Sequence, residues 1–376
     1  MTISQGLQPL LPISDEYLWF TICLEQCLTM NNSQRIEFID LAKGICIILV
    51  ILGHLVPAFN ENFTFVFCFR IPLYFCLSGL FFKDYGGFKQ LFAKKTNKIL
   101  IPFIAWYFIS YLIYYAGHGI YGLKSGDALY SITDILTSNS IFNIPIWFLL
   151  CLFWSNLIFY IIKLFSHNIF FIGTGIFIVA FIGWAMSLLN IPNILYIGSA
   201  CSCMPYFFMG YALKRSSLLY PTKQWQKDFA IMLIALTVGA LMAFIPDDPP
   251  RHVYFINKIK SGNLFTIYIC AASFVIGILL LCKRIGHLPF VSWLGRYSIM
   301  VLVTHMLVGT VFLGLQARLF RGVLSLEQVY PLNFVFVVLS MLIIIPFCKK
   351  YMPYITAQKD IFGPEGLIAK RFNKNK

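Results

Sequence analysis

A lysine and a histidine stand out in the first long apolar run of the chain. Lys43 and His54 lie eleven positions apart in the run Asp40-Leu-Ala-Lys-Gly-Ile-Cys-Ile-Ile-Leu-Val-Ile-Leu-Gly-His54. On a helix this interval is about three turns, so both side chains project from one face, ~16 Å apart along the axis. Ionisable groups within an apolar segment are costly to bury in lipid and mark functional sites. Because histidine is the commonest general base, His54 is the first candidate for a catalytic residue.

The spacing of these residues suggests a substrate with a long arm. The interval resembles the reach of a pantetheine arm, with its phosphates near Lys43 and its thioester near His54. Asp40 lies one turn before Lys43 and could orient its ammonium group. In the structural alternative, Lys43 is an anchor that reaches the membrane interface and His54 is a packing residue with a satisfied ring. The alignment of Lys43 with His54 favours a functional role for His54.

The second apolar run contains a cation and two hydroxyl groups, in Arg70, Tyr74 and Ser78. Arg70 fits two interpretations equally well: an interface anchor paired with Glu61, or a contact to substrate. Tyr74 and Ser78 are candidates for orienting the His54 ring. We do not expect Ser78 to be a nucleophile, because the sequence offers it no adjacent base except His54.

Two further residues are weaker candidates. His305 is the only other histidine deep in an apolar run, and bonding to a neighbouring helix is slightly favoured over catalysis for it. Trp147 fits packing or a platform for an acceptor better than a catalytic role. The eleven cysteines are scattered, with no CxxC pair and no His/Cys grouping at ligand spacing, so no metal site is predicted.

The composition requires that these residues lie in a membrane. Of 376 residues, 59% are hydrophobic and only 12% are charged, whereas a soluble domain carries roughly 25% charged residues. One core cannot hide that much apolar surface, which excludes a soluble enzyme. The net charge of +14 is spread over short Lys/Arg clusters between apolar runs. This pattern follows the positive-inside rule, with anionic membrane lipid as the partner, and does not indicate nucleic acid.

The apolar runs predict an all-α, polytopic bundle of about ten transmembrane helices, each near the length that crosses a bilayer core. The expected spans are residues 41–59, 64–82, 99–116, 141–162, 169–189, 194–213, 229–245, 264–282, 297–315 and 332–348. Most of the 29 Lys and Arg residues then fall on one side, which predicts that both termini are cytoplasmic.

Three regions are expected along the chain. They are an N-terminal cytoplasmic segment over residues 1–38, a ten-span domain over 39–350 and a basic cytoplasmic tail over 351–376. No basic n-region precedes the first apolar stretch, so no cleavable signal peptide is expected. The polar stretch after Met30 suggests that residue as an alternative start. The two halves show no convincing repeat, which weakens the case for a transporter built from inverted repeats.

Several blocks, taken in order, resemble one known family. Besides Asp40, Lys43 and Gly53-His54, the blocks are Arg70-Ile-Pro-Leu-Tyr-Phe-Cys-Leu-Ser-Gly79, Lys95-Thr-Asn-Lys98-Ile-Leu-Ile-Pro102, Pro145-Ile-Trp147-Phe-Leu149, Pro205-Tyr-Phe-Phe-Met-Gly210-Tyr, and Leu294-Gly-Arg-Tyr-Ser298 with His305. They span the chain from about Arg35 to Lys350, and their order resembles the membrane-bound acyltransferase family 3, the O-acyltransferases of bacterial surface polysaccharides.

The resemblance implies an enzyme with His54 as its catalytic histidine and Lys43 as the basic partner. Lys95 and Lys98 would be the basic pair that binds acyl-CoA. The family commonly has arginine at the Lys43 position and often at the basic pair, and lysine lacks the bidentate fork of arginine. No esterase-like domain is appended here, although some relatives carry one. The remaining supporting or acceptor-binding candidates are Asp40, Arg70, Tyr74, Ser78, Trp147 and His305.

By the same resemblance the donor is acetyl-CoA or another acyl-CoA, bound as a substrate, with no permanently bound cofactor. The acceptor would be a carbohydrate or glycolipid, and the protein would be a multi-pass protein of the bacterial inner membrane. His54 could act as a base or carry the acyl group itself. The competing class is a transporter or flippase of a lipid-linked sugar, which would need no acyl-CoA. A third possibility, a catalytically silent membrane partner, predicts that His54 can be replaced without consequence. The sequence leaves the oligomeric state open.

Overall fold

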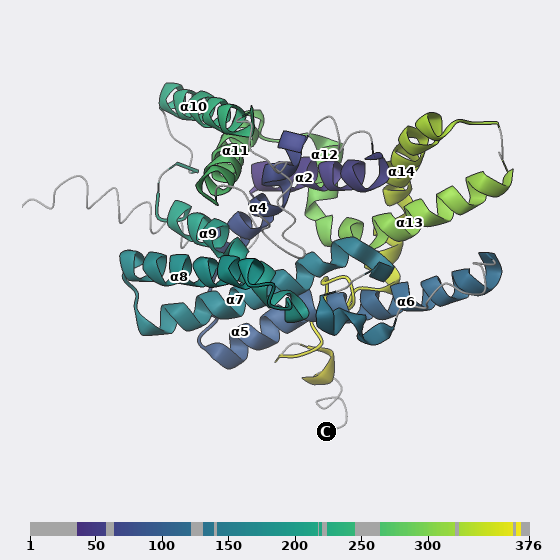
Figure 1. Cartoon of the computed structure of the whole chain (residues 1–376), viewed down its shortest axis with the longest axis horizontal. Helices are drawn as coiled ribbons and strands as arrows, with labels where there is room; N and C mark the ends of the chain where they lie inside the picture. Colours follow the sequence, from purple (N-terminus) through teal and green to yellow (C-terminus); the bar gives the residue numbers. More distant parts are fainter. Residues whose placement is uncertain are drawn as a thin grey trace, which may run out of the picture. The chain divides into compact units, whose positions relative to one another are not determined.

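The computed structural model describes residues 36–57, 64–121, 131–138, 141–216, 218–219, 224–244, 264–319, 323–363 and 366–369. Every regular element in these residues is helical and none is a strand (Figure 1). The predicted segment 1–38 and the alternative start at Met30 lie almost wholly outside the described residues. The long helices are α2 (Glu37–Leu55), α4 (Thr64–Leu80), α6 (Ile101–Tyr121), α7 (Trp147–Phe165), α8 (Ile169–Leu188), α9 (Ile197–Leu213), α10 (Trp225–Phe244), α11 (Leu264–Ile285), α13 (Ser298–Leu319) and α14 (Leu326–Tyr351).

Short helices connect or precede several of these. They are α5 (Phe88–Lys95), α12 (Pro289–Arg296), the π-helix η1 (Thr96–Leu100) and the 3₁₀ segments η2 (Ile132–Thr137), η3 (Ile141–Ile146) and η4 (Ile194–Tyr196). The π-helix η1 joins α5 to α6 without a break, so residues Phe88–Ala116 form one continuous helical stretch that contains an apolar window long enough to span a membrane. The α12 helix was not among the predicted elements, because eight residues are too few for a span.

A long helix occupies each of the ten predicted spans, so the all-α prediction is confirmed. Within the described residues, eight helices are long and apolar enough to cross a membrane. The two that fall short are α4 and α9, with 17 residues each. A span of this length is at the lower end of what a bilayer core needs. The chain is therefore a multi-pass membrane protein with at least eight helices of spanning character in the part that the structure describes.

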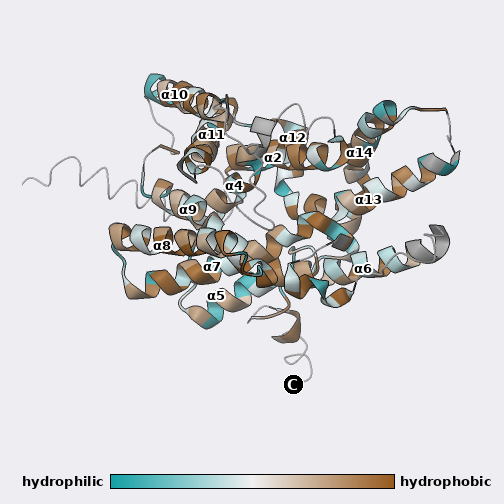
Figure 2. Ribbon diagram, in the orientation of Figure 1, coloured by the Kyte–Doolittle hydropathy of each residue, from teal (hydrophilic) through white to brown (hydrophobic). Residues whose placement is uncertain are grey.

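Large apolar side chains on the outer helices face away from the protein. Phe170 on α8 is 83% exposed and Ile343 on α14 is 76% exposed, with many similar residues along both helices. Figure 2 shows apolar residues along most of the helices. A soluble protein rarely leaves such continuous apolar surface in water, whereas lipid covers it without cost. By contrast, α9 is buried along most of its length and packs against α4, α7 and α8.

Glycines set the closest helix contacts around the candidate site. A β-carbon on Gly44 of α2 would overlap the carbonyl oxygen of Val291 in α12, and one on Gly295 would overlap that of Asp40. On the other side of the bundle, Gly79 of α4 and Gly210 of α9 pack in the same way. Small residues at such crossings allow backbones in membranes to touch. The pair Gly44 and Gly295 thereby fixes α12 against the first turns of α2.

Candidate active site

Two histidines from distant parts of the chain lie side by side. His54 occupies the last turn of α2, and His305 lies on α13, which follows directly on α12. Their ring centroids are 5.6 Å apart with a tilt of 42° between the planes. His305 is fully buried, whereas His54 is half-buried and remains approachable. Both histidines named from the sequence thus belong to one site.

The ring of His305 has one nitrogen fixed and one nitrogen unpaired. Its Nδ1 lies 2.9 Å from the carbonyl oxygen of Val301, one turn earlier on α13. A carbonyl only accepts, so Nδ1 carries the proton in the neutral ring and Nε2 presents a lone pair. The Nε2 atom is buried and has no hydrogen-bond partner within the described residues. This leaves a second base, besides His54, available to a hydroxyl group.

Arg70 brings a positive charge to this pair from α4. Its Nη1 donates to the carbonyl oxygen of Leu49 on α2 at 3.1 Å. The guanidinium also interacts electrostatically with both His54 and His305. Glu61, the expected ion-pair partner of Arg70, lies outside the described residues. The hydrogen bond therefore ties Arg70 to the backbone of α2 between Lys43 and His54, and its role as a substrate contact stays a prediction.

The other end of α2 carries a cationic pair around a buried carboxylate. Asp40 is only 3% exposed, and its two oxygens lie 3.9 Å from Lys43 Nζ and 3.7 Å from Arg296 Nε. The side chains of Lys43 and Arg296 are 28% and 37% exposed, so both charges remain accessible to an anion. Tyr74 donates its hydroxyl proton to the carbonyl oxygen of Lys43 at 2.9 Å, which ties α4 to α2 at this level. Asp40 lies within reach of Lys43, as expected, whereas the hydroxyl of Tyr74 bonds to the backbone of Lys43, eleven residues before the His54 ring that it was expected to orient.

The structure draws attention to two residues that the sequence reasoning missed. Arg296 reaches Asp40 only because Gly44 and Gly295 bring α12 onto α2, and no spacing along the sequence reveals such a contact. The pair Gly295-Arg296 in the family block was its only signal. Asn333 on α14 is the second, and a single asparagine in a span gave no signal at all.

Asn333 carries two buried polar atoms without a partner. Its side chain is fully buried, and neither Oδ1 nor Nδ2 has a hydrogen-bond partner within the described residues. A buried polar group left unsatisfied costs roughly 1–3 kcal/mol, and lipid offers no alternative partner.

The contacts of Ser78 and Trp147 are with residues other than the two histidines. Ser78 accepts a hydrogen bond at 3.2 Å from the side-chain amide of Asn156 on α7. Trp147 begins α7, and its buried ring packs 5.9 Å from that of Tyr196. Neither contact joins these residues to the histidine pair. The packing interpretation of Trp147 agrees with this position.

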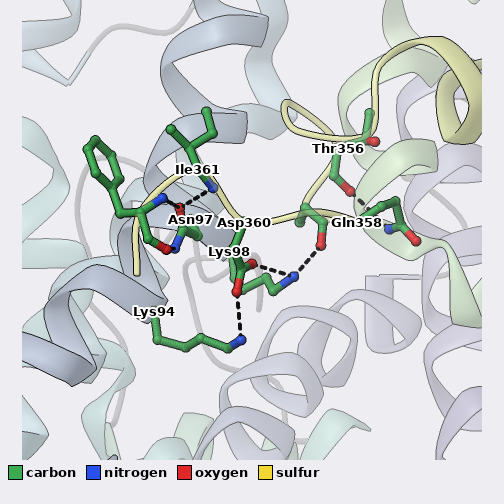
Figure 3. Close-up of polar contacts among 9 residues, drawn as sticks. Lys94, Asn97, Lys98, Thr356, Gln358, Asp360 and Ile361 are labelled. Atoms are coloured by element: carbon green, nitrogen blue, oxygen red, sulfur yellow. Dashed lines mark hydrogen bonds and ion pairs between the residues drawn. The ribbon is translucent and has the colours of Figure 1, made fainter. Parts of the chain in front are cut away.

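The predicted basic pair lies in the region around η1, where the chain after α14 folds back. Lys98 Nζ lies 2.9 Å from Asp360 Oδ1 and 2.8 Å from the carbonyl oxygen of Ala357, and Lys94 Nζ lies 2.9 Å from Asp360 Oδ2 (Figure 3). Lys95 lies on the same short helix and is half-buried. Asp360 therefore holds the place between two lysines that a phosphate oxygen could also take.

The side chain of Asn97 binds the backbone of the same segment, which follows α14. Its Oδ1 accepts from the backbone N–H groups of Ile361 and Phe362, both at 2.9 Å, and its Nδ2 donates to the carbonyl oxygen of Phe362 at 2.9 Å (Figure 3). The first part of the predicted tail, residues 351–376, is thus docked on η1 as far as Phe362. Within the described residues, no three His, Cys, Asp or Glu side chains gather as a metal site would require.

Comparisons with known proteins identify the family of the chain. A family model described as an acyltransferase domain matches residues 36–348, which is most of the chain. The chain is similar to a nodulation protein, NolL, of Mesorhizobium japonicum, with 24% identity over 236 residues, 58% of this chain and 58% of that protein. The chain thus spans less than two thirds of that relative. No solved structure matches this chain. With a helical membrane domain and the match over residues 36–348, the chain belongs to the membrane-bound acyltransferase family 3.

Proposed function

We propose that this protein transfers an acyl group, in the simplest case acetyl, from acyl-CoA to a hydroxyl group of a carbohydrate or lipid-linked sugar. The observation that carries the proposal is the half-buried His54 beside His305, at the far end of α2 from the pair Lys43 and Arg296. We further propose that the protein works in the bacterial cytoplasmic membrane, where cytoplasmic acyl-CoA meets a lipid-bound acceptor.

The donor would bind along α2. Lys43 and Arg296 would hold its phosphates, and the pantetheine arm would cover the ~16 Å to His54 that the helix rise implies. Arg296 supports this placement because its guanidinium offers the forked donors that Lys43 lacks. Lys95 and Lys98 would add positive charge on the same side, with Asp360 as the group that a donor phosphate would displace from Lys98.

The chemistry would be a single acyl transfer. His54, in its neutral form, takes the proton of the acceptor hydroxyl while the hydroxyl oxygen attacks the thioester carbonyl carbon. The C–S bond breaks, the thiolate of CoA leaves, and the imidazolium returns the proton to it. General base catalysis typically contributes ~10²–10⁴-fold, so positioning by Arg70, Asp40 and Tyr74 must supply much of the rest. In a two-step variant His54 itself is acylated first, which lets the substrates bind in turn.

The decisive experiment uses the purified protein in nanodiscs with acetyl-CoA. We expect the wild type to bind acetyl-CoA and to hydrolyse or transfer its acetyl group. His54→Ala should lower this turnover by about 100-fold or more, since a general base contributes at least that much, while acetyl-CoA still binds. His167→Ala is the matched control, because that histidine is exposed in the turn between α7 and α8.

The alternative functions give different results. A flippase needs no acyl donor, so a wild type that fails to bind acyl-CoA would favour that class and contradict the enzyme. A catalytically silent partner predicts that His54→Ala behaves like His167→Ala in every assay.

A further inference from the structure

The buried amide of Asn333 lies at the same level of the bundle as the histidine pair. Asn333 is the eighth residue of α14, and His54 is in the last turn of α2. A β-carbon on Gly309 would lie 3.5 and 3.6 Å from the two amide atoms of Asn333, and 2.7 Å from Cδ2 of Leu55, the residue after His54. One glycine of α13 is therefore flanked by Asn333 on one side and by the end of α2 on the other.

The same face of α13 also carries His305. Gly309 follows His305 by four residues, so the two share a face and lie about one turn, ~5.4 Å, apart. Three polar atoms without partners within the described residues thus border one stretch of α13: His305 Nε2, Asn333 Oδ1 and Asn333 Nδ2. Gly309, with no side chain, lets the Asn333 amide and the end of Leu55 approach this face of α13 closely.

The chemistry of these atoms specifies what would satisfy them. Oδ1 only accepts and Nδ2 only donates, while Nε2 of His305 presents a lone pair. An acyl chain offers no hydrogen-bonding groups and would leave the three atoms unsatisfied. Neighbouring hydroxyl groups donate and accept at once, so a polyol can meet all three within one turn of helix.

We propose that Asn333 binds the acceptor, holding a hydroxyl group next to the one that is acylated. The amide oxygen accepts the proton of that hydroxyl, and the amide nitrogen donates to an adjacent oxygen. Asn333 thereby selects acceptors with neighbouring hydroxyl groups and turns the reacting one toward His54. This inference rests on the proposed acyltransferase function and adds a specificity-determining residue to it.

The test replaces Asn333 by leucine, which has a similar shape and no polar atom. Two probes serve as acceptors with acetyl-CoA: methyl glucopyranoside, and cyclohexylmethanol, which keeps the primary hydroxyl on a ring and lacks the others. We expect the wild type to prefer the glucoside in kcat/KM and Asn333→Leu to reduce that preference by roughly tenfold or more, since a site built to bind a hydroxyl discriminates strongly against its absence. The control for basal activity is His167→Ala, at an exposed position between α7 and α8, which should keep both the acceptor preference and the hydrolysis of acetyl-CoA without acceptor within about twofold of the wild type.

Thermal unfolding in the same nanodiscs separates binding from a structural role. Removing two unsatisfied polar atoms should leave the Tm of Asn333→Leu unchanged or higher. The matched control is Asn97→Leu, because Asn97 is also buried but makes three hydrogen bonds, and its Tm should fall. Gly309→Ala is a second variant. Its methyl group would displace the end of the Leu55 side chain, 2.7 Å away, and would meet the amide at ordinary contact distance. It should lower the same preference by a smaller factor.

Each outcome decides the matter. A lower Tm for Asn333→Leu, similar to that of Asn97→Leu, would make Asn333 a structural residue. An unchanged preference between the two acceptors would mean that its amide binds water alone. If the wild type hydrolyses acetyl-CoA but acylates neither probe, the inference about Asn333 fails, while the proposal that the protein is an acyl-CoA-dependent enzyme stands. If the wild type does not use acetyl-CoA at all, the proposed function itself fails.

Discussion

At the scale of single residues, His54 and His305 lie near opposite ends of the membrane domain in sequence, and their ring centroids are 5.6 Å apart in the structure. Nδ1 of His305 faces a backbone carbonyl, so the orientation of this ring is fixed by its own helix. His54 is half-buried and is the ring that a substrate reaches first. This arrangement suits one imidazole that reacts and a second that positions the acceptor hydroxyl.

The coupling of the two histidines can be measured with a double mutant. We expect His305→Ala to lower kcat for acyl transfer by about 10- to 100-fold, less than His54→Ala, because it removes a positioning contact and not the base. If the two rings act on one hydroxyl, the double variant should be no more than about threefold slower than His54→Ala alone, since residues that act as a unit are not additive. If the fold-reduction in kcat of the double variant equals the product of the two single reductions, the two histidines contribute independently. The pH profile of kcat should also differ between the two single variants.

Sequence reasoning reached most of the site at this scale, and its failures have a physical cause. Lys43 and His54 could be paired because both lie on one helix, where spacing fixes direction. Arg296 could not be placed, because its contact with Asp40 depends on the crossing of α12 and α2. Asn333 gave no signal because an unsatisfied amide is visible only when its surroundings are known. Ser78, expected near His54, is instead bonded to Asn156.

At the scale of elements, the apolar runs predicted the positions of the long helices, but they did not predict that the segment after α14 packs against η1. The segment after α14 was expected to be a basic tail, and its residues 353–362 dock on η1 through Asn97, Lys98 and Asp360. No periodicity in the sequence could reveal this contact, because it joins residues some 260 positions apart by hydrogen bonds to the backbone. Lys98 is thus both a candidate for donor binding and a partner of the docked segment.

Replacing Asp360 separates these two roles. Burial raises the pKa of Asp360, but the hydrogen bonds and charges of Lys94 and Lys98 outweigh this effect and lower the pKa below its ordinary value. Asp360→Asn removes the negative charge that pairs with both lysines, while Lys98 keeps its hydrogen bond to the carbonyl oxygen of Ala357. If Lys98 binds donor phosphates, acetyl-CoA should bind about two- to fivefold more tightly, the range expected from one partly exposed ion pair, and Lys98→Met should weaken binding. Titration calorimetry at two salt concentrations measures both.

A purely structural pair gives the opposite pattern. In that case Asp360→Asn and Lys98→Met both lower the Tm and leave acetyl-CoA affinity unchanged. The pH dependence follows from the sign of the shift. A carboxylate whose pKa is lowered by folding stabilises the docked segment fully above its unfolded pKa, and this stability is lost as the pH falls through the lowered value. In Asp360→Asn this acid-dependent loss should be absent.

At the scale of the whole molecule, the helical membrane domain followed directly from composition, whereas the number of crossings depends on two helices. The helices α4 and α9 have 17 residues each and pack closely through Gly79 and Gly210. Both are shielded from lipid more than α8 or α14, so their hydropathy alone does not decide whether they cross. With both crossing there are ten spans, as predicted, and with neither there are eight.

The side of the membrane on which His167 lies distinguishes these two topologies. His167 is exposed between α7 and α8, and Ile191 is exposed just beyond the other end of α8. Six of the long helices follow His167 if α9 crosses, which puts His167 on the side of the C-terminus. If α9 does not cross, five follow and His167 lies on the opposite side.

We expect ten spans, with His167 and the C-terminus both cytoplasmic. Single replacements His167→Cys and Ile191→Cys, each with a C-terminal tag, can be labelled in intact cells with a membrane-impermeant maleimide. The nine cysteines that the structure describes are buried, so background labelling should be low. Before permeabilisation, only Ile191→Cys should react with the maleimide. His167→Cys should not react, and the C-terminal tag should be inaccessible from outside, because both are expected on the cytoplasmic side. Because α8 spans in both topologies, the two cysteines must always report opposite sides, which makes each the control for the other. Labelling of His167→Cys from outside, with the tag still protected, would mean that α9 lies within the bundle without crossing. It would also remove the sidedness on which donor entry near Lys98 depends.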